Sequence, residues 1–227
     1  MKTIAIITCV IPNMVTLCEN LVKSGEEIKS NEYKLKWYYI SSLKNIENIS
    51  GMSHLAHCNV NIDPSVNHAS ALHMIYDYQF NEDIIMIIDC DCCFKLKNWD
   101  KTIVNLLENN DIISVNLSRK DAPRGNDTHR KFPSVFFMAM SREKYFSLNI
   151  DFHPTLEKTT IKAEINNNIK VKLDTGYKIC DYLGDVKYFN LQNIAERDGT
   201  QSWYYNESIM IRHLRRGRQS KRHNIKL

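Results

Sequence analysis

Two aspartates one residue apart, Asp89 and Asp91, directly follow the apolar run of residues 84–88. Five consecutive apolar residues are typical of a strand that is buried on both faces of a sheet. In open α/β sheets, ligands bind beyond the carboxyl ends of the strands. Carboxylate oxygens suit Mg²⁺ or Mn²⁺, which also take the phosphates of a substrate as ligands. The pair therefore predicts a site that holds a diphosphate through a metal ion.

The geometry of an extended chain adds a second expectation for this pair. Residues i and i+2 of a strand point to the same side, so both carboxylates would face one ligand and Cys90 would face away. Cys90, Cys92 and Cys93 have no second cysteine cluster elsewhere in the sequence, and their spacing is not that of a structural zinc site. We expect them to be small buried side chains.

The elements that must position the pair alternate between strand and helix patterns. Strands are expected over residues 2–8, 35–41, 56–62, 83–89, 111–118 and 135–140, and helices over 13–25, 63–80, 98–110 and 141–148. The first helix is expected to stop at Gly25, a typical C-cap residue. This alternation predicts an α/β fold: an open mixed sheet, mostly parallel and flanked by helices, with a nucleotide-binding, Rossmann-like core.

The later part of the chain has weaker patterns. Residues 161–173 are expected to form a hairpin, a helix begins at Asp174, and residues 185–191 form a late strand. Residues 192–211 are expected to be irregular. Trp203, Tyr204 and Tyr205 within them are either an aromatic platform for an acceptor or part of the core.

The length and amino-acid composition indicate which general kind of protein this is. The 227 residues are 43% apolar, which is enough for one α/β domain with a real core. The seven cysteines show no framework spacing, which favours a reducing compartment. No apolar run reaches the roughly 18 residues of a membrane span, so no transmembrane segment is expected and a cytoplasmic location is predicted. Residues 212–227 contain seven Lys and Arg and no acidic residue, a composition that attracts phosphate.

A family resemblance is carried by the segment HASALHMIYDYQFNEDIIMIIDCDCCF, residues 68–94. Its order of histidine-containing helix, apolar strand and D-x-D pair resembles the GT-A glycosyltransferases, especially the family-2 type. The resemblance covers most of the chain by pattern rather than by close identity. It implies one GT-A-like domain, in which residues 1–118 bind a nucleoside diphosphate sugar, residues 119–211 bind the acceptor, and residues 212–227 form a basic tail. A UDP-sugar is the expected donor.

The resemblance also implies roles for residues of the first half. Asp91 would bind the metal ion, Mn²⁺ or Mg²⁺, and Asp89 would contact the ribose or the sugar. Thr8 and Cys9, at the end of the first strand, would flank the nucleotide base. His68 either lies near the sugar or its diphosphate or has a plain role on the surface of its helix.

Asp174 is the residue that the resemblance implies for catalysis. In inverting members an aspartate at the start of a helix, often preceded by another acid, takes the proton of the acceptor hydroxyl. Here LDTGYKICDYL places Asp174 in that position, after Leu173 instead of an acid. A carboxylate there fits general-base chemistry, and it also fits a helix N-cap. Asp151 is the next candidate for the base.

The basic tail resembles the end of the family pattern in the order of His213, Gly217 and Lys221. On this resemblance His213 completes the metal shell, and Lys221 approaches the diphosphate, where cations stabilise the charge that develops on departure. The alternative is a tail without a place in the site.

Two other functions compete with a glycosyltransferase. A nucleotidyltransferase also needs carboxylates and a metal, but the segment TCVIPNM after the first strand has none of the glycines of a phosphate loop. A non-enzymatic nucleic-acid-binding protein would act through the basic tail and would leave the two aspartates unexplained. The acceptor of a transferase remains open, and an anionic glycan, a lipid-linked sugar or a nucleic acid would each fit the tail.

Overall fold

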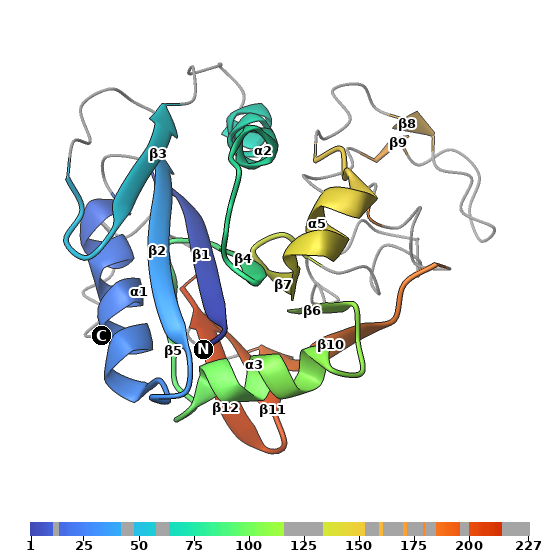
Figure 1. The fold of residues 1–227 in the computed structure, drawn as a ribbon. Helices are drawn as coiled ribbons and strands as arrows, with labels where there is room; N and C mark the ends of the chain where they lie inside the picture. Colours follow the sequence, from blue (N-terminus) through green and yellow to red (C-terminus); the bar gives the residue numbers. More distant parts are fainter. Residues whose placement is uncertain are drawn as a thin grey trace.

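The computed structural model describes residues 1–10, 14–41, 48–57, 64–115, 134–152, 159–160, 170–171, 179, 185–195 and 200–214. They form a large mixed sheet with helices packed against it (Figure 1). The elements, in chain order, are β1 (Thr3–Val10), α1 (Val15–Ile28), β2 (Lys34–Ser41), β3 (Ser53–His57), α2 (Pro64–Met74), η2 (Ile75–Asp77), β4 (Ile84–Ile88), β5 (Cys92–Phe94), α3 (Trp99–Leu107), β6 (Ile112–Val115), β7 (Phe137–Ser141), α5 (Arg142–Leu148), β8 (Thr159–Thr160), β9 (Lys170–Val171), β10 (Tyr188–Ala195), β11 (Gln201–Tyr205) and β12 (Ser208–His213).

The main sheet has ten strands in the order β3-β2-β1-β4-β7-β6-β10-β11-β12-β5, and β8 pairs with β9 separately. Parallel pairs join β3, β2, β1 and β4, and one more joins β6 to β10. The pairs made by β7, and those that link β10, β11, β12 and β5, are antiparallel. The mixed α/β class is therefore confirmed, and parallel pairing predominates only in the part built by the first strands.

Alternating side chains of the central strands divide the core into two layers. Ile4 and Ile6 of β1 pack with residues of α1 and α3, whereas Ala5 and Ile7 pack with residues of α2 and α5. Strand side chains point alternately to opposite faces, so a continuous apolar strand buries both. Helices thus cover both faces of the central strands, as the unbroken apolar run of β4 predicts. Within the described part of the chain, no helix has the length and apolarity of a membrane span.

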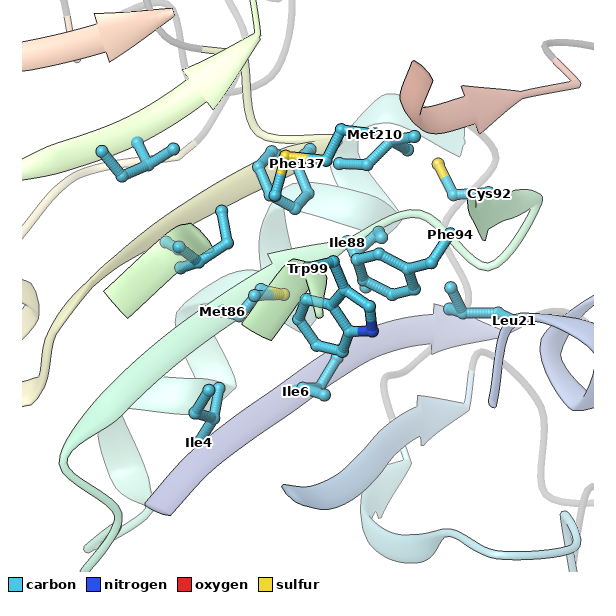
Figure 2. Close-up of a cluster of buried hydrophobic side chains, with 14 of the residues drawn as sticks. Ile4, Ile6, Leu21, Met86, Ile88, Cys92, Phe94, Trp99, Phe137 and Met210 are labelled. Atoms are coloured by element: carbon cyan, nitrogen blue, oxygen red, sulfur yellow. The ribbon is translucent and has the colours of Figure 1, made fainter. Parts of the chain in front are cut away.

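The sheet curls back on itself at the end of β4. This strand is fourth in the sheet order and β5 is tenth, yet only three residues separate Ile88 from Cys92. The far edge of the sheet must therefore return to the carboxyl end of β4. The cluster of buried side chains in Figure 2 fills the space inside this curl, and the rings of Phe94 and Trp99 are stacked there with centroids 3.9 Å apart.

Two expectations about local structure are wrong. Helix α1 continues past Gly25 to Ile28, because Gly25 serves a close contact instead of a helix end. A Cβ atom at this position would lie 2.7 Å from the ring of Trp37 on β2. Residues 192–211 are also not irregular, since they contain the end of β10, strand β11 and most of β12. Their pairing with distant strands is a long-range contact that local patterns do not reveal.

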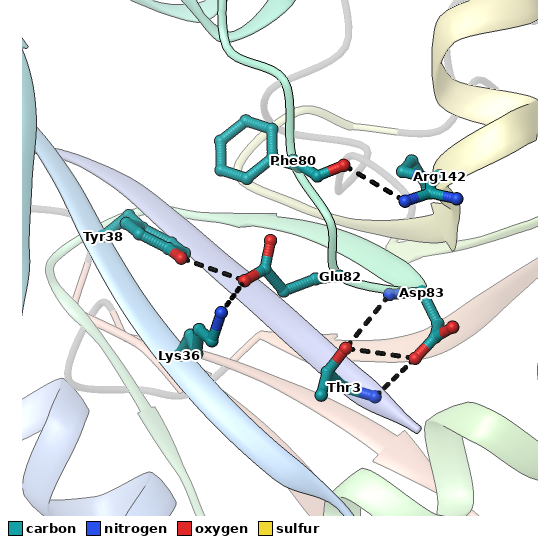
Figure 3. A network of polar contacts seen from close by, with 7 residues as sticks. All are labelled: Thr3, Lys36, Tyr38, Phe80, Glu82, Asp83 and Arg142. Atoms are coloured by element: carbon teal, nitrogen blue, oxygen red, sulfur yellow. Dashed lines mark hydrogen bonds and ion pairs between the residues drawn. The ribbon is translucent and has the colours of Figure 1, made fainter. Parts of the chain in front are cut away.

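A network of polar contacts ties the starts of β1, β2 and β4 together (Figure 3). Glu82 is 2% exposed, and its Oε1 accepts hydrogen bonds from Lys36 Nζ and, at 3.0 Å, from Tyr38 Oη. Oδ2 of Asp83 accepts from the backbone N–H of Thr3 at 2.7 Å. Burial by itself raises the pKa of Glu82, but the hydrogen bonds from Lys36 and Tyr38 and the charge of Lys36 outweigh it. The pKa of Glu82 therefore lies below its usual value.

We predict that Glu82→Gln lowers the free energy of unfolding by about 1 kcal/mol at neutral pH. The amide oxygen can still accept hydrogen bonds, but it lacks the negative charge that strengthens them. A depressed folded-state pKa contributes stability above the unfolded value near 4.5, and this contribution disappears as the pH falls through the folded value. The two proteins should therefore become equally stable in acid, which urea denaturation at neutral and acidic pH will measure. Glu27→Gln, on the exposed side of α1, is the control. A gap that stays constant in acid would contradict the prediction.

Candidate metal centre

The two aspartates lie in a turn between β4 and β5. The N–H of Asp89 donates to the carbonyl of Phe136 at 2.9 Å, and the N–H of Cys92 donates back to the carbonyl of Asp89 at 3.2 Å. The expectation of an extended backbone through Asp91 is therefore wrong, because the chain must reverse here to join β5. Cys90 is buried in a small apolar cluster that includes Cys18 of α1.

Strand β12 brings His213 to this turn. It runs antiparallel to β5 with His213 opposite Cys92, and the N–H of Leu214 donates to the carbonyl of Asp91 at 3.0 Å. Nε2 of His213 lies 2.9 Å from Oδ1 of Asp91 and 3.7 Å from Oδ2 of Asp89. The structure thus brings together three of the residues that the sequence singles out.

Burial and charge act in opposite directions on His213. Its side chain is 11% exposed, that of Asp91 is 8% exposed, and that of Asp89 is 29% exposed. Burial lowers the pKa of His213, whereas the charge of Asp91, the hydrogen bond to it and the charge of Asp89 raise it. The pKa of His213 lies above its usual value as a result. Two carboxylates close to one buried imidazole form a negative site that favours a cation.

The spacing of these donors fits a divalent ion. Ligands at about 2.1 Å from one octahedral ion lie about 3 Å from each other, which is close to the Asp91–His213 separation. Cys92 also lies within 4.8 Å of both residues. Its thiol belongs to the apolar cluster beside Met210 (Figure 2), and burial together with the charge of Asp91 raises its pKa well above the usual value.

The thiol of Cys92 is a soft donor, which Mg²⁺ and Mn²⁺ take less readily than a carboxylate or an imidazole. The remaining donors are carboxylate oxygens and one imidazole nitrogen. Such a set suits Mn²⁺ and Mg²⁺ better than a soft metal. The five cysteines in the described ranges, Cys9, Cys18, Cys90, Cys92 and Cys93, are all free thiols.

His68 is an additional neighbour of the two aspartates. Its Nε2 lies 3.7 Å from Oδ1 of Asp89, whereas the other oxygen of this carboxylate, Oδ2, is the one near His213. His68 lies in the first half of α2, and a helix that leads into a parallel strand begins at the sheet edge where the strands end. The order of helix and strand along the chain is therefore the sequence signal that could have predicted His68 near the aspartates. His73, further along α2, instead contacts Asp151 at 3.0 Å.

The other predicted residues have mixed outcomes. Thr8 is buried near the end of β1, and its Oγ1 has no hydrogen-bond partner among the residues described, while the neighbouring Cys9 is half-buried. Trp203 is fully buried against Phe136, so it is a core residue and not an acceptor platform. Asp174, Gly217 and Lys221 lie outside the described residues.

Comparison with known proteins finds similar solved structures but no similar sequences. No family model and no curated protein sequence matches this chain. The solved structures that are similar to it include three glycosyltransferases. The galactosyltransferase LgtC, in complex with donor and acceptor sugar analogues, is 10% identical over 63% of this chain and 59% of LgtC, with a TM-score of 0.44. The bifunctional glycosyltransferase WbbM, in its apo form, is 10% identical over 65% of this chain and 33% of WbbM, with a TM-score of 0.46.

The third structure is the mannosyltransferase PcManGT from Pyrobaculum calidifontis in complex with GDP-Man and Mn²⁺. It is 12% identical over 62% of this chain and 44% of its own length, with a TM-score of 0.43. The chain therefore spans about three fifths of LgtC and less than half of the other two.

The turn of the hairpin that carries His213 has a strained backbone conformation. Strands β11 and β12 are joined by Asn206 and Glu207, whose φ angles are 44° and 64°. Two positive φ angles are typical of a type I′ turn, which favours Asn followed by Gly. Glu207→Gly should raise the free energy of unfolding by about 1 kcal/mol, because glycine has no Cβ clash in this region. Thermal and urea denaturation will measure the change.

The control is Glu207→Ala, which removes the charge but keeps the Cβ atom. It should give little or no gain. If both substitutions stabilise the protein equally, loss of the carboxylate and not relief of backbone strain would explain the effect.

Proposed function

We propose that this chain is a metal-dependent glycosyltransferase that moves a sugar from a nucleoside diphosphate sugar to a hydroxyl group of an acceptor. One observation carries the proposal: Asp91 and His213 converge to 2.9 Å at the carboxyl end of the buried strand β4, with Asp89 beside them. In α/β sheets this edge is where nucleotides and their phosphates bind.

In this proposal Asp91 and His213 hold Mn²⁺ or Mg²⁺, and Asp89 contacts the ribose or the sugar. A bound ion of this kind supplies positive charge to the diphosphate as it departs. Thr8 and Cys9 flank the nucleotide base at the end of β1, and Lys221 approaches the diphosphate. The proposed donor is a UDP-sugar.

The proposed reaction is inverting, with Asp174 as the base. Its carboxylate takes the proton from the acceptor hydroxyl while that oxygen forms a bond to the anomeric carbon and the bond to the diphosphate breaks. The proposed acceptor is an anionic glycan, a lipid-linked sugar or a nucleic acid, because the basic tail of residues 212–227 favours a partner with phosphate or other negative charge.

A screen of nucleotide sugars with Mn²⁺ present tests the reaction class. Release of a nucleoside diphosphate, measured by coupled assay or chromatography, is expected for one donor and should stop when EDTA removes the metal. Release of pyrophosphate from a nucleoside triphosphate would instead indicate a nucleotidyltransferase. If no donor is hydrolysed and DNA binds in a strongly salt-dependent way, the chain is a nucleic-acid-binding protein.

The metal site gives a sharper prediction. Asp91→Asn keeps the shape of the side chain and can still accept a hydrogen bond from His213, but it removes a charged ligand. We expect the Mn²⁺-dependent affinity for UDP, measured by calorimetry, to fall at least about tenfold while the protein stays folded. Asp111→Asn is the matched control, since Asp111 is a partly exposed carboxylate that contacts Lys144. Equal Mn²⁺-dependent affinity in Asp91→Asn and wild type would remove Asp91 from the site.

The base is tested by Asp174→Asn, which keeps the size and the capping ability of the side chain but cannot take up the proton. Donor binding should remain near normal, and transfer should fall by about 10²–10⁴-fold, as for other lost general bases. Asp151→Asn discriminates between the two candidate carboxylates, since Asp151 pairs with His73. A large loss of transfer in Asp151→Asn with a normal rate in Asp174→Asn would move the base to Asp151.

A further inference from the structure

The orientation of His213 needs an explanation. A histidine that binds a metal ion through one nitrogen usually donates its other ring N–H to a carboxylate, a carbonyl or a water molecule, and this bond fixes the ring. In the described part of the chain, Nδ1 of His213 is buried and has no hydrogen-bond partner. Nε2 is hydrogen-bonded to Asp91 in this structure, but a metal ion bound at Nε2 would replace that bond. Another contact must then hold the ring.

Aromatic stacking is the contact that the structure provides. The ring of Phe136 lies nearly parallel to the imidazole of His213, with centroids 5.1 Å apart and an angle of 12° between the planes. Trp203 of β11 contacts both rings. The centroid of its ring lies 5.9 Å from that of His213 and 4.9 Å from that of Phe136. Trp203 is fully buried, so this side of the cluster is part of the core. A flat ring against the imidazole face restricts its rotation about the side-chain bonds.

Phe136 also contacts the other half of the site. Its backbone carbonyl accepts the hydrogen bond from the N–H of Asp89, at 2.9 Å. The turn that holds Phe136 is itself fixed, because the single O–H of Ser114 is shared between the carbonyls of Phe137, at 2.8 Å, and Ser134, at 3.1 Å. One residue thus fixes the backbone of the first aspartate and the side chain of the distant histidine.

We propose that Phe136 is a positioning residue for the metal centre: its ring orients the imidazole of His213 toward Asp91 in place of the usual hydrogen bond from the second ring nitrogen. The role in metal binding depends on the proposed function, whereas the orientation of the ring does not. The aromatic face is the property that matters, so a tyrosine should replace it and a leucine of similar apolarity should not.

Calorimetry of the full chain with Mn²⁺ alone tests the first part. We expect Phe136→Leu to weaken Mn²⁺ binding by about tenfold, the lower end of the loss seen when a support of a metal ligand is removed. Phe136→Tyr should bind as wild type does. Phe189→Leu removes another half-buried ring, one that contacts Tyr205, and should leave Mn²⁺ affinity unchanged. Equal affinity in Phe136→Leu and wild type would overturn the proposal, as would equal losses in the tyrosine and leucine variants.

A measurement without metal separates this inference from the proposed function. A stacked aromatic face shields the protons of its neighbour, so the imidazole protons of His213 should resonate upfield in NMR spectra of the metal-free protein. The shift should persist in Phe136→Tyr and become clearly smaller in Phe136→Leu, where only the more distant ring of Trp203 still contributes. If Phe136 controls the shift but wild type binds no Mn²⁺, the positioning role stands and the metal-dependent function fails. If wild type binds Mn²⁺ and the shift and affinity are the same in Phe136→Leu, the metal site stands and the positioning role is wrong.

Discussion

The pairing of β5 with β12 is the interaction on which the candidate site depends. Its register sets His213 opposite Cys92, so that the imidazole reaches the side chain of the preceding Asp91. Side chains alternate with a period of two along a strand, and a shift of one residue would turn His213 to the opposite face. The irregularity where Trp203 and Tyr204 of β11 pair with β12 adds one residue, Met210, to β12 and allows both Met210 and Ile211 to be buried.

Packing inside the curled sheet holds this pairing in place. Phe94 of β5 and Ile211 of β12 are opposite each other in the ladder and belong to one buried cluster with Trp99 of α3. Burial of apolar surface is strong but non-directional, whereas backbone hydrogen bonds select the register. The two effects together return the far edge of the sheet to the end of β4. The site therefore occupies the point where the curl closes, and its shape follows from the core beneath it.

The candidate site was predictable to different degrees at its different residues. Asp89 and Asp91 are visible in the sequence, because they interrupt an apolar run at a strand end. His213 had no local signal, and only the resemblance to a family indicated a role for it. His68 follows from the order of helix and strand once the fold is known. Phe136 could not have been found from the sequence, since its ring contact with His213 joins segments that are distant along the chain.

The α/β class, the first strands and helices and the position of the two aspartates follow from local hydrophobic periodicity, so they could be predicted from the sequence. Three other features depend on contacts between residues that are distant in the sequence, and only the tertiary structure shows them. It ended α1 beyond Gly25, since that glycine makes room for Trp37, and it ordered residues 201–213 as a hairpin against β5. It also reversed the chain at Asp91, because β5 pairs with β12 and does not continue β4. Strand pairing joins residues far apart in sequence, and no local pattern specifies the partner.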